Sequence, residues 1–208
     1  WDKDRFMTYI KLPRPMFYVN PKYLDEVDNR RFRVNMGARW DEVPVLAPIG
    51  MDEPLVRSYL MHFFVEAESW NDFVQYIKED YLKPVFAETK IVNGVGDPEK
   101  WYSMLQPSEY QALQERVDID FAYTNKDVFG PQEDVSLKVY VKNVKTLIVK
   151  VFEINARNYY ETNGREVDTD INLDGLVANE ERVETYDEVA LRRVERSFPF
   201  PSLKERGV

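Results

Sequence analysis

The chain has 208 residues, 44% of them hydrophobic and 31% charged, a composition that suits a globular protein of one or two domains. Its 28 Lys and Arg against 37 Asp and Glu leave a formal charge of −9, which disfavours a nucleic-acid partner. The sequence contains no cysteine, so disulfides, thiolate metal sites and cysteine nucleophiles are excluded, and no apolar run approaches the roughly 18 residues of a membrane span.

Two further features concern the setting of the chain. No Asn is followed by the x-Ser/Thr of a glycosylation acceptor, which together with the lack of cysteine favours an intracellular or bacterial setting. The first residue is Trp1 and not Met, so we expect a fragment of a larger multidomain protein.

The first predicted elements are extended. Three prolines within residues 12–21 exclude a central strand and predict an extended segment. Residues 31–40 and 55–65 are predicted to be strands, the second because it is rich in Tyr, Phe and Val. Between them, the apolar loop of residues 43–50 should pack against a neighbouring surface.

Three helices are predicted next from their caps. Ser69 followed by Asp72, with an apolar stripe behind them, predicts a helix near residues 70–82 that ends before Pro84. Asp97 followed by Pro98 predicts the start of a second helix. A capping box at residues 108–111 predicts a third helix, so that helices cover residues 98–117.

From residue 118 the hydrophobic period changes to two. Apolar and polar residues alternate over 135–142, the β-branched run of residues 146–154 follows, and a short turn at 143–145 would join the two into a hairpin. Residues 119–123 and 173–177 are shorter strand candidates, and residues 198–201 form an extended aromatic end. Short strands at this spacing are typical of a β-sandwich.

The sequence therefore predicts an α+β fold in two domains. Residues 1–117 would form a small mixed region with about three helices, near 70–82 and 98–117. Residues 118–208 would form a mainly antiparallel β-sandwich.

Residues 121–125, 135–160 and 174–177 resemble a macroglobulin-type β-sandwich module, as found in alpha-2-macroglobulin and its bacterial relatives. The resemblance covers about residues 118–208 and rests on hydrophobic strand patterns. The reactive thioester of that family needs a Cys-Gly-Glu-Gln sequence, and this chain has no cysteine. The resemblance therefore implies a structural segment of such a protein.

No catalytic constellation emerges from the sequence, and we assign neither catalytic residues nor a cofactor. His62, the only histidine, lies in an aromatic stretch without a recognisable partner, so we interpret it as structural. The glycines at 94 and 96 are interpreted as a turn and helix cap, because the acids that follow would repel a pyrophosphate. Adjacent carboxylates at 41/42, 52/53 and 66/68 are interpreted as solvated.

One motif has metal-binding spacing. Residues 170–181 fit a calcium-loop pattern, in which Asp170, Asn172, Asp174 and Glu181 are the candidate ligands. The preceding residues 159–169 are typical of a hairpin turn and not of an entering helix. A strand would send the first three side chains out along one face instead of around an ion. We therefore predict no bound calcium and commit to no metal site.

One segment of the chain is strongly acidic. Residues 161–190 hold ten acids against Arg165 and Arg182, and basic residues on either side could pair with them across an antiparallel sheet or leave a patch for a basic partner.

Three classes of function remain. The first is a non-enzymatic structural or protein-interaction module that binds a protein partner or neighbouring domains of its own chain. The second is a calcium-stabilised binding domain, and the third is a carboxylate-based hydrolase. We prefer the first, because it explains the missing catalytic constellation.

Overall fold

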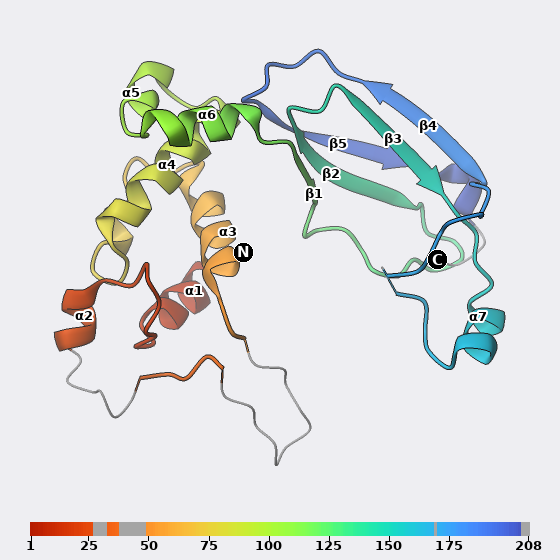
Figure 1. Ribbon diagram of the computed structural model, residues 1–208, viewed down its shortest axis with the longest axis horizontal. Helices are drawn as coiled ribbons and strands as arrows, with labels where there is room; N and C mark the ends of the chain where they lie inside the picture. The colour runs from red at the N-terminus through yellow and green to blue at the C-terminus, as the bar shows by residue number, and fades with distance from the viewer. Residues whose placement is uncertain (27–32, 38–48, 169, 205–208) are drawn as a thin grey trace.

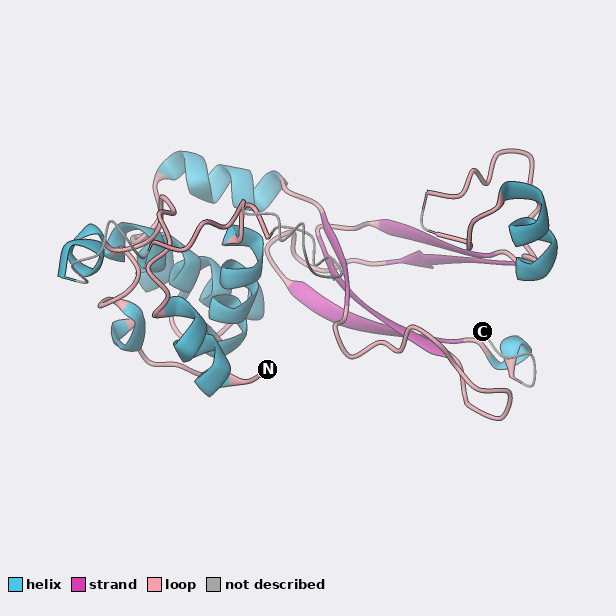
Figure 2. Cartoon of the chain, turned by 90° about the horizontal axis from the view of Figure 1, so that it is seen from below, coloured by secondary structure: helices cyan, strands magenta, loops and turns pink. Residues whose placement is uncertain are grey.

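The computed structural model describes residues 1–26, 33–37, 49–168 and 170–204. Helices dominate the first part of the chain and two antiparallel sheets the second, which confirms the predicted α+β class (Figure 1). Figure 2 shows most helices gathered at one end and the strands at the other, with α7 and the short turn η2 beyond the strands. Within the described ranges, no helix has the length and hydrophobicity needed to cross a bilayer.

The elements have these bounds. The helices are α1 (Lys3–Ile10), α2 (Pro21–Glu26), α3 (Glu53–Phe64), α4 (Glu79–Asn93), α5 (Pro98–Tyr102), α6 (Pro107–Glu115) and α7 (Ala156–Asn163), with short 3₁₀ turns η1 (Asn71–Phe73) and η2 (Pro201–Leu203). The strands are β1 (Asp118–Phe121), β2 (Ser136–Lys142), β3 (Thr146–Val151), β4 (Glu180–Thr185) and β5 (Arg193–Pro199).

Helix α3 occupies the stretch that was predicted as a strand over residues 55–65, so that prediction is wrong. Val56, Leu60 and Phe64 recur every four residues and are fully buried on one face of the helix. The ring of Phe64 lies edge-on to that of Phe86 on α4 at 5.0 Å. Burial of this stripe outweighs the β propensity of the aromatic residues.

The predicted helix over residues 70–82 is also wrong. Between residues 70 and 78 only the short turn η1 forms. Helix α4 begins at Glu79 and continues through Pro84. The interruption has a tertiary cause, because the backbone of Lys78 donates to the carbonyl of Tyr18 at 2.9 Å and Ile77 forms a bridge with Val19. A segment far away in sequence thus holds residues 74–78 out of the helix.

The two later helices were predicted from their caps. The Asp97 carboxylate accepts the backbone N–H of Glu99 at 3.0 Å and begins α5, which confirms that cap. Helix α6 begins at Pro107, one residue before the predicted box, and the Glu109 carboxylate accepts the backbone N–H of Gln106 at 2.8 Å. Helices α1, α2 and α3 were missed, so the first part holds more helices than the predicted three.

The sheets form by long-range pairing. β2 lies between β1 and β5, and β3 pairs with β4, all antiparallel. The predicted β2–β3 hairpin is wrong, because both edges of β2 are occupied by other strands. The sheets share one apolar cluster, in which the buried side chains of Val139, Val141 and Phe198 meet Leu147 and Val149 from β3.

Other predictions fail or lie outside the described residues. Residues 173–177 form a turn instead of a strand. The first part of the turn predicted at 159–169 is the end of α7, which is capped by Gly164 with φ +67°. Half of the predicted strand at 31–40 and most of the apolar loop at 43–50 lie outside the described residues, and residues 33–37 are not a strand.

Candidate functional site

A cleft of about 800 Å³ lies between α3 and β1, where the helical part meets the first sheet. One wall is a stripe of α3 opposite its buried face, including Arg57, Met61 and His62. The other wall is continuous, because every residue from 118 to 124 lines it. A helix face and the edge of a strand therefore enclose the cleft between them.

The charges in the cleft are bonded to one another. The Glu88 carboxylate accepts from Arg57 on α3 and from Arg116 at 2.8 Å, and Arg116 also reaches Asp118 at 2.6 Å. Arg193 on β5 pairs with Asp120 on β1 at 3.0 Å. Desolvation lowers the pKa of Arg116, but its bonds to Asp118 and Glu88 outweigh this effect and raise the pKa above its ordinary value. The cleft thus presents neutralised ion pairs and not a free catalytic carboxylate pair.

Aromatic rings form one end of the cleft. The ring of Trp1 stacks on His62 at 4.8 Å and meets Tyr123 edge-on at 5.1 Å. Burial lowers the pKa of His62, which keeps the imidazole neutral near neutral pH. His62 lies on α3 and not on a strand, and its exposed ring contacts those of Trp1 and Phe63.

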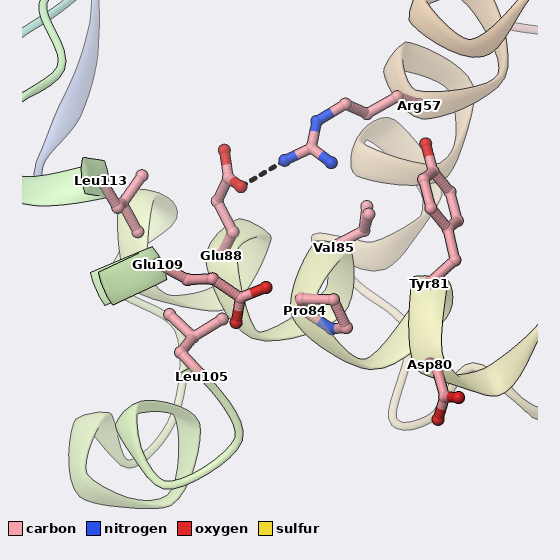
Figure 3. A pocket seen from close by; sticks show the side chains of 9 residues that line it. All are labelled: Arg57, Asp80, Tyr81, Pro84, Val85, Glu88, Leu105, Glu109 and Leu113. Carbon is pink, nitrogen blue, oxygen red and sulfur yellow. Dashed lines mark hydrogen bonds and ion pairs between the residues drawn. The ribbon is translucent and has the colours of Figure 1, made fainter. Parts of the chain in front are cut away.

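A smaller pocket of about 310 Å³ adjoins this cleft and shares Arg57 and Glu88 with it. Figure 3 shows Glu88 reaching Arg57, with Leu105, Leu113 and Glu109 on one side and Tyr81 on the other. Tyr81 donates to Glu53 at 2.6 Å, and burial followed by this bond raises the pKa of Tyr81. The polar groups that line this smaller pocket are therefore largely bonded to partners within the chain.

A buried ionic cluster anchors the helical part. Asp52 was interpreted as solvated, and this interpretation is wrong, because its side chain and that of Arg14 are both 0% exposed and form an ion pair. The hydroxyls of Tyr9 and Tyr18 donate to the same carboxylate at 2.7 and 2.5 Å. Burial and these bonds raise the pKa of both tyrosines. The Asp52 carboxylate is thus saturated with donors, whereas Nε and Nη2 of the buried Arg14 have no hydrogen-bond partner. The cluster holds the start of α3 against α1.

The four calcium-loop candidates lie on different structures. Asp170 pairs with Arg165 at 2.8 Å, and Asn172 accepts the backbone N–H of Asp174 within a turn. Glu181 lies on β4 and pairs with Lys150 at 3.4 Å. In the described part of the chain, no three His, Cys, Asp or Glu side chains gather as a metal site would require. Helix α7 does precede the loop, which corrects the sequence argument that no helix enters it.

We therefore keep the prediction that residues 170–181 bind no calcium. Isothermal titration of the chain should give no heat of binding beyond dilution at micromolar calcium, since three candidate oxygens are already paired or turn-bound. The matched variant is Glu181→Gln, which removes the bidentate ligand of the pattern. Micromolar binding that disappears in Glu181→Gln would contradict the prediction.

The acidic segment is paired in part across the sheet. Lys150 and Glu181 are direct register partners on β3 and β4, as a cross-strand arrangement requires. Arg196 on β5 pairs with Glu188. Glu188 lies in the loop after β4, so the interpretation as cross-strand partners is confirmed only for Lys150 and Glu181.

Comparison with known proteins places this architecture in a family. A family model described as the actin-binding protein F N-terminal domain matches residues 1–117. The chain belongs to the actin-binding protein F family. A second model, described as the AbpF first immunoglobulin-like domain, matches residues 147–208. None of the solved structures matches the chain.

A curated relative has the same family name. Actin-binding protein F of Dictyostelium discoideum is 35% identical over 213 residues, which cover 100% of this chain and 9% of the relative. The chain thus spans less than a tenth of a much larger protein. The printed names of the relative and of the family models refer to actin binding and to an immunoglobulin-like domain.

The macroglobulin resemblance is wrong. From residue 147 onward the region on which it rested matches an immunoglobulin-like domain of this family, and the relative that aligns with the whole chain is an actin-binding protein F. Alternating β-branched residues report a half-buried strand and are shared by many sandwich folds, so this pattern could not separate the two families.

The residues that build the cleft were missed by sequence reasoning. Arg57, Glu88 and Arg116 gave no local signal, because the paired side chains are 28 or 31 positions apart along the chain. The β1 edge was predicted as a strand, but its position opposite α3 depends on the packing of the two parts.

Proposed function

We propose that this chain is a non-enzymatic protein-interaction region and that actin is its partner. The observation that carries the proposal is the match along the whole chain to a relative named for binding actin, at 35% identity. A relative that resembles the chain from end to end supports a shared role for both its helical part and its sheets.

The geometry is consistent with surface recognition. Charged groups in the cleft neutralise one another, whereas Phe121 and Tyr123 on its rim are 67% and 77% exposed. Exposed aromatic side chains beside a cleft are typical of protein interfaces.

We also propose that the chain consists of two domains that meet near residue 118. Two separate apolar clusters, one among the helices and one between the sheets, support this division. Leu191, which precedes β5, packs into the helical cluster and joins the two regions.

The test is co-sedimentation of the purified chain with actin filaments. We expect the pelleted fraction to rise and saturate with filament concentration, and to fall as salt is added if exposed charges contribute. The control is the same chain centrifuged without filaments. A pelleted fraction equal to that control at every filament concentration would remove actin as the partner of this part of the family protein.

A further inference from the structure

Strand β1 has one unpaired edge. The backbone N–H of Ala122 donates to the carbonyl of Lys138 at 3.0 Å, and the register continues with Asp120 opposite Tyr140. In an antiparallel pair, alternate residues point their backbone groups toward the partner strand. The N–H and C=O groups of Ile119 and Phe121 therefore point away from β2, and within the described ranges no hydrogen bond satisfies them.

This unpaired edge lines the cleft opposite α3. Residues 118–124 contribute to the cleft without a gap, and Tyr140 and Arg193, on the same sheet face as Asp120, line it as well. The cleft therefore borders the edge of β1 together with one face of the sheet. A volume of about 800 Å³ is within the range of sites that enclose a ligand. The free backbone groups thus face an open groove with a helical wall.

Apolar side chains accompany the unpaired edge. Ile119 and Phe121 share a sheet face with their register partners Val141 and Val139, which are buried between the sheets. At the β1 edge this face is uncovered, so Ile119 and Phe121 remain 50% and 67% exposed. An exposed, apolar, unpaired edge is a template for another strand.

The charges indicate which segment fits. Each arginine of the groove is paired with a carboxylate of the groove, as Arg57 and Arg116 are with Glu88 and Arg193 is with Asp120. Two further carboxylates line the groove, Asp118, which also pairs with Arg116, and Glu53, which accepts from Tyr81, so four carboxylate side chains face three arginines. The groove therefore has a small negative excess and complements an uncharged or weakly basic segment.

We propose that this groove binds an extended segment of a partner protein, which adds to β1 as a fourth strand of the sheet. The segment carries apolar residues at alternate positions to cover Ile119 and Phe121, with neutral or basic residues between them. Its backbone pairs with the free groups of Ile119 and Phe121, while its other face lies against α3. This binding mode goes beyond the proposed actin binding, and it is tested without actin.

Amide hydrogen exchange tests the geometry in the unmodified chain. The amides of Ile119 and Phe121 should exchange rapidly, while those of Asp120 and Ala122, which face β2, should be protected. Slow exchange at Ile119 and Phe121 in dilute protein would show that the edge is already paired and would overturn the proposal. Protection that appears only at high protein concentration would assign the edge to a second copy of the chain and would also overturn it.

A displayed library of random peptides of about nine residues, panned on the immobilised chain, tests the occupant. We expect the recovered sequences to alternate apolar with neutral or basic residues, and the synthesised peptides to protect the amides of Ile119 and Phe121 on binding. Recovery of no binding sequence, or of sequences without this alternation, would overturn the proposal.

Two variants locate the binding. Ile119→Pro removes an amide that faces the groove and leaves the β2 ladder intact, a position where edge strands tolerate proline. We expect it to weaken peptide binding about tenfold or more, as Phe121→Thr should. The control is Val183→Thr on β4, where the valine is 58% exposed and outside the groove. With thermal melts that show all three variants folded, equal peptide affinity in Ile119→Pro and Val183→Thr would overturn the proposal.

Discussion

Replacing Asp52 with alanine should remove about 3–5 kcal/mol from the free energy of unfolding. The Asp52 carboxylate is the counter-ion of a fully buried Arg14 and the acceptor for two tyrosine hydroxyls. Its removal leaves a guanidinium in the interior without an opposite charge, and such a charge costs more than the pair contributes. Domains of ordinary stability have only about 5–15 kcal/mol, so the variant should be largely unfolded under mild denaturing conditions.

Urea denaturation measures this effect, and the chain offers a matched control. Asp72 forms an ion pair with Lys3 at 2.9 Å, but both side chains are more than half exposed. Asp72→Ala should therefore change the free energy of unfolding by about 0–1 kcal/mol. Equal shifts of the urea midpoint in Asp52→Ala and Asp72→Ala would show that the buried cluster contributes no more than a surface pair.

A double variant separates the buried charge from the lost hydrogen bonds. Arg14→Leu combined with Asp52→Asn removes both charges and keeps an oxygen that can accept from Tyr18. We expect the double variant to be more stable than Asp52→Ala, because no isolated charge remains. A double variant as unstable as Asp52→Ala would place the cost in the hydrogen bonds and packing instead.

Local signals predicted those elements that depend on neighbouring residues. The Asp97 carboxylate and Pro98 begin α5 through bonds within two residues, so the sequence contains the whole mechanism of that cap. Alternation over residues 136–142 likewise predicted β2, because one face of this strand is buried and the pattern reports burial directly.

Helix α3 was predicted as a strand because two patterns overlap in one stretch. Tyr59, Phe63 and Phe64 favour a strand by propensity, while Val56, Leu60 and Phe64 have the spacing of a helix face. The second pattern was readable, and Pro54 in the first turn supports it. The strand prediction followed the propensity of the aromatic residues. The packing of α3 against α4 instead favours the helical spacing of the apolar residues.

The candidate site could not be predicted, because its contacts are made between distant residues. Asp52 and Arg14, for example, are 38 positions apart along the chain. In the sequence Asp52 stands next to Glu53 and cannot be told from a solvated acid. The β2–β3 hairpin failed for a related reason. A short turn predicts pairing of adjacent strands, but β1 and β5 occupy both edges of β2.

The junction between the two parts of the chain depends on the end of β2. Lys142 is 1% exposed, and its ammonium donates to the carbonyl of Arg116 at 2.5 Å, just beyond α6. The Asn143 amide donates to the carbonyls of Gln114 and Glu115 at 3.2 and 3.1 Å. The last carbonyls of a helix lack partners within it, and a cation near them is favoured by the helix dipole. The sheet thus completes the end of α6.

Lys142→Met should destabilise the chain by about 1.5–3 kcal/mol, the range for a hydrogen bond to a charged group. Methionine retains the length and apolar stem of lysine, so the change removes mainly the donor and leaves the Arg116 carbonyl without its partner. Desolvation lowers the pKa of Lys142, which shows that part of the gain from this bond is offset by burial and argues for the lower half of that range.

The control is Lys138→Met on the same strand, where a 46% exposed lysine pairs with Glu195 at 3.7 Å and should contribute less than about 1 kcal/mol. Equilibrium unfolding followed by far-UV circular dichroism compares the two variants, and we expect the larger shift in Lys142→Met, with a broader transition because the helices and sheets lose a shared contact. Equal shifts in both variants, with unchanged slopes, would mean that the junction is held by apolar packing around Leu191 and not by the bond from Lys142.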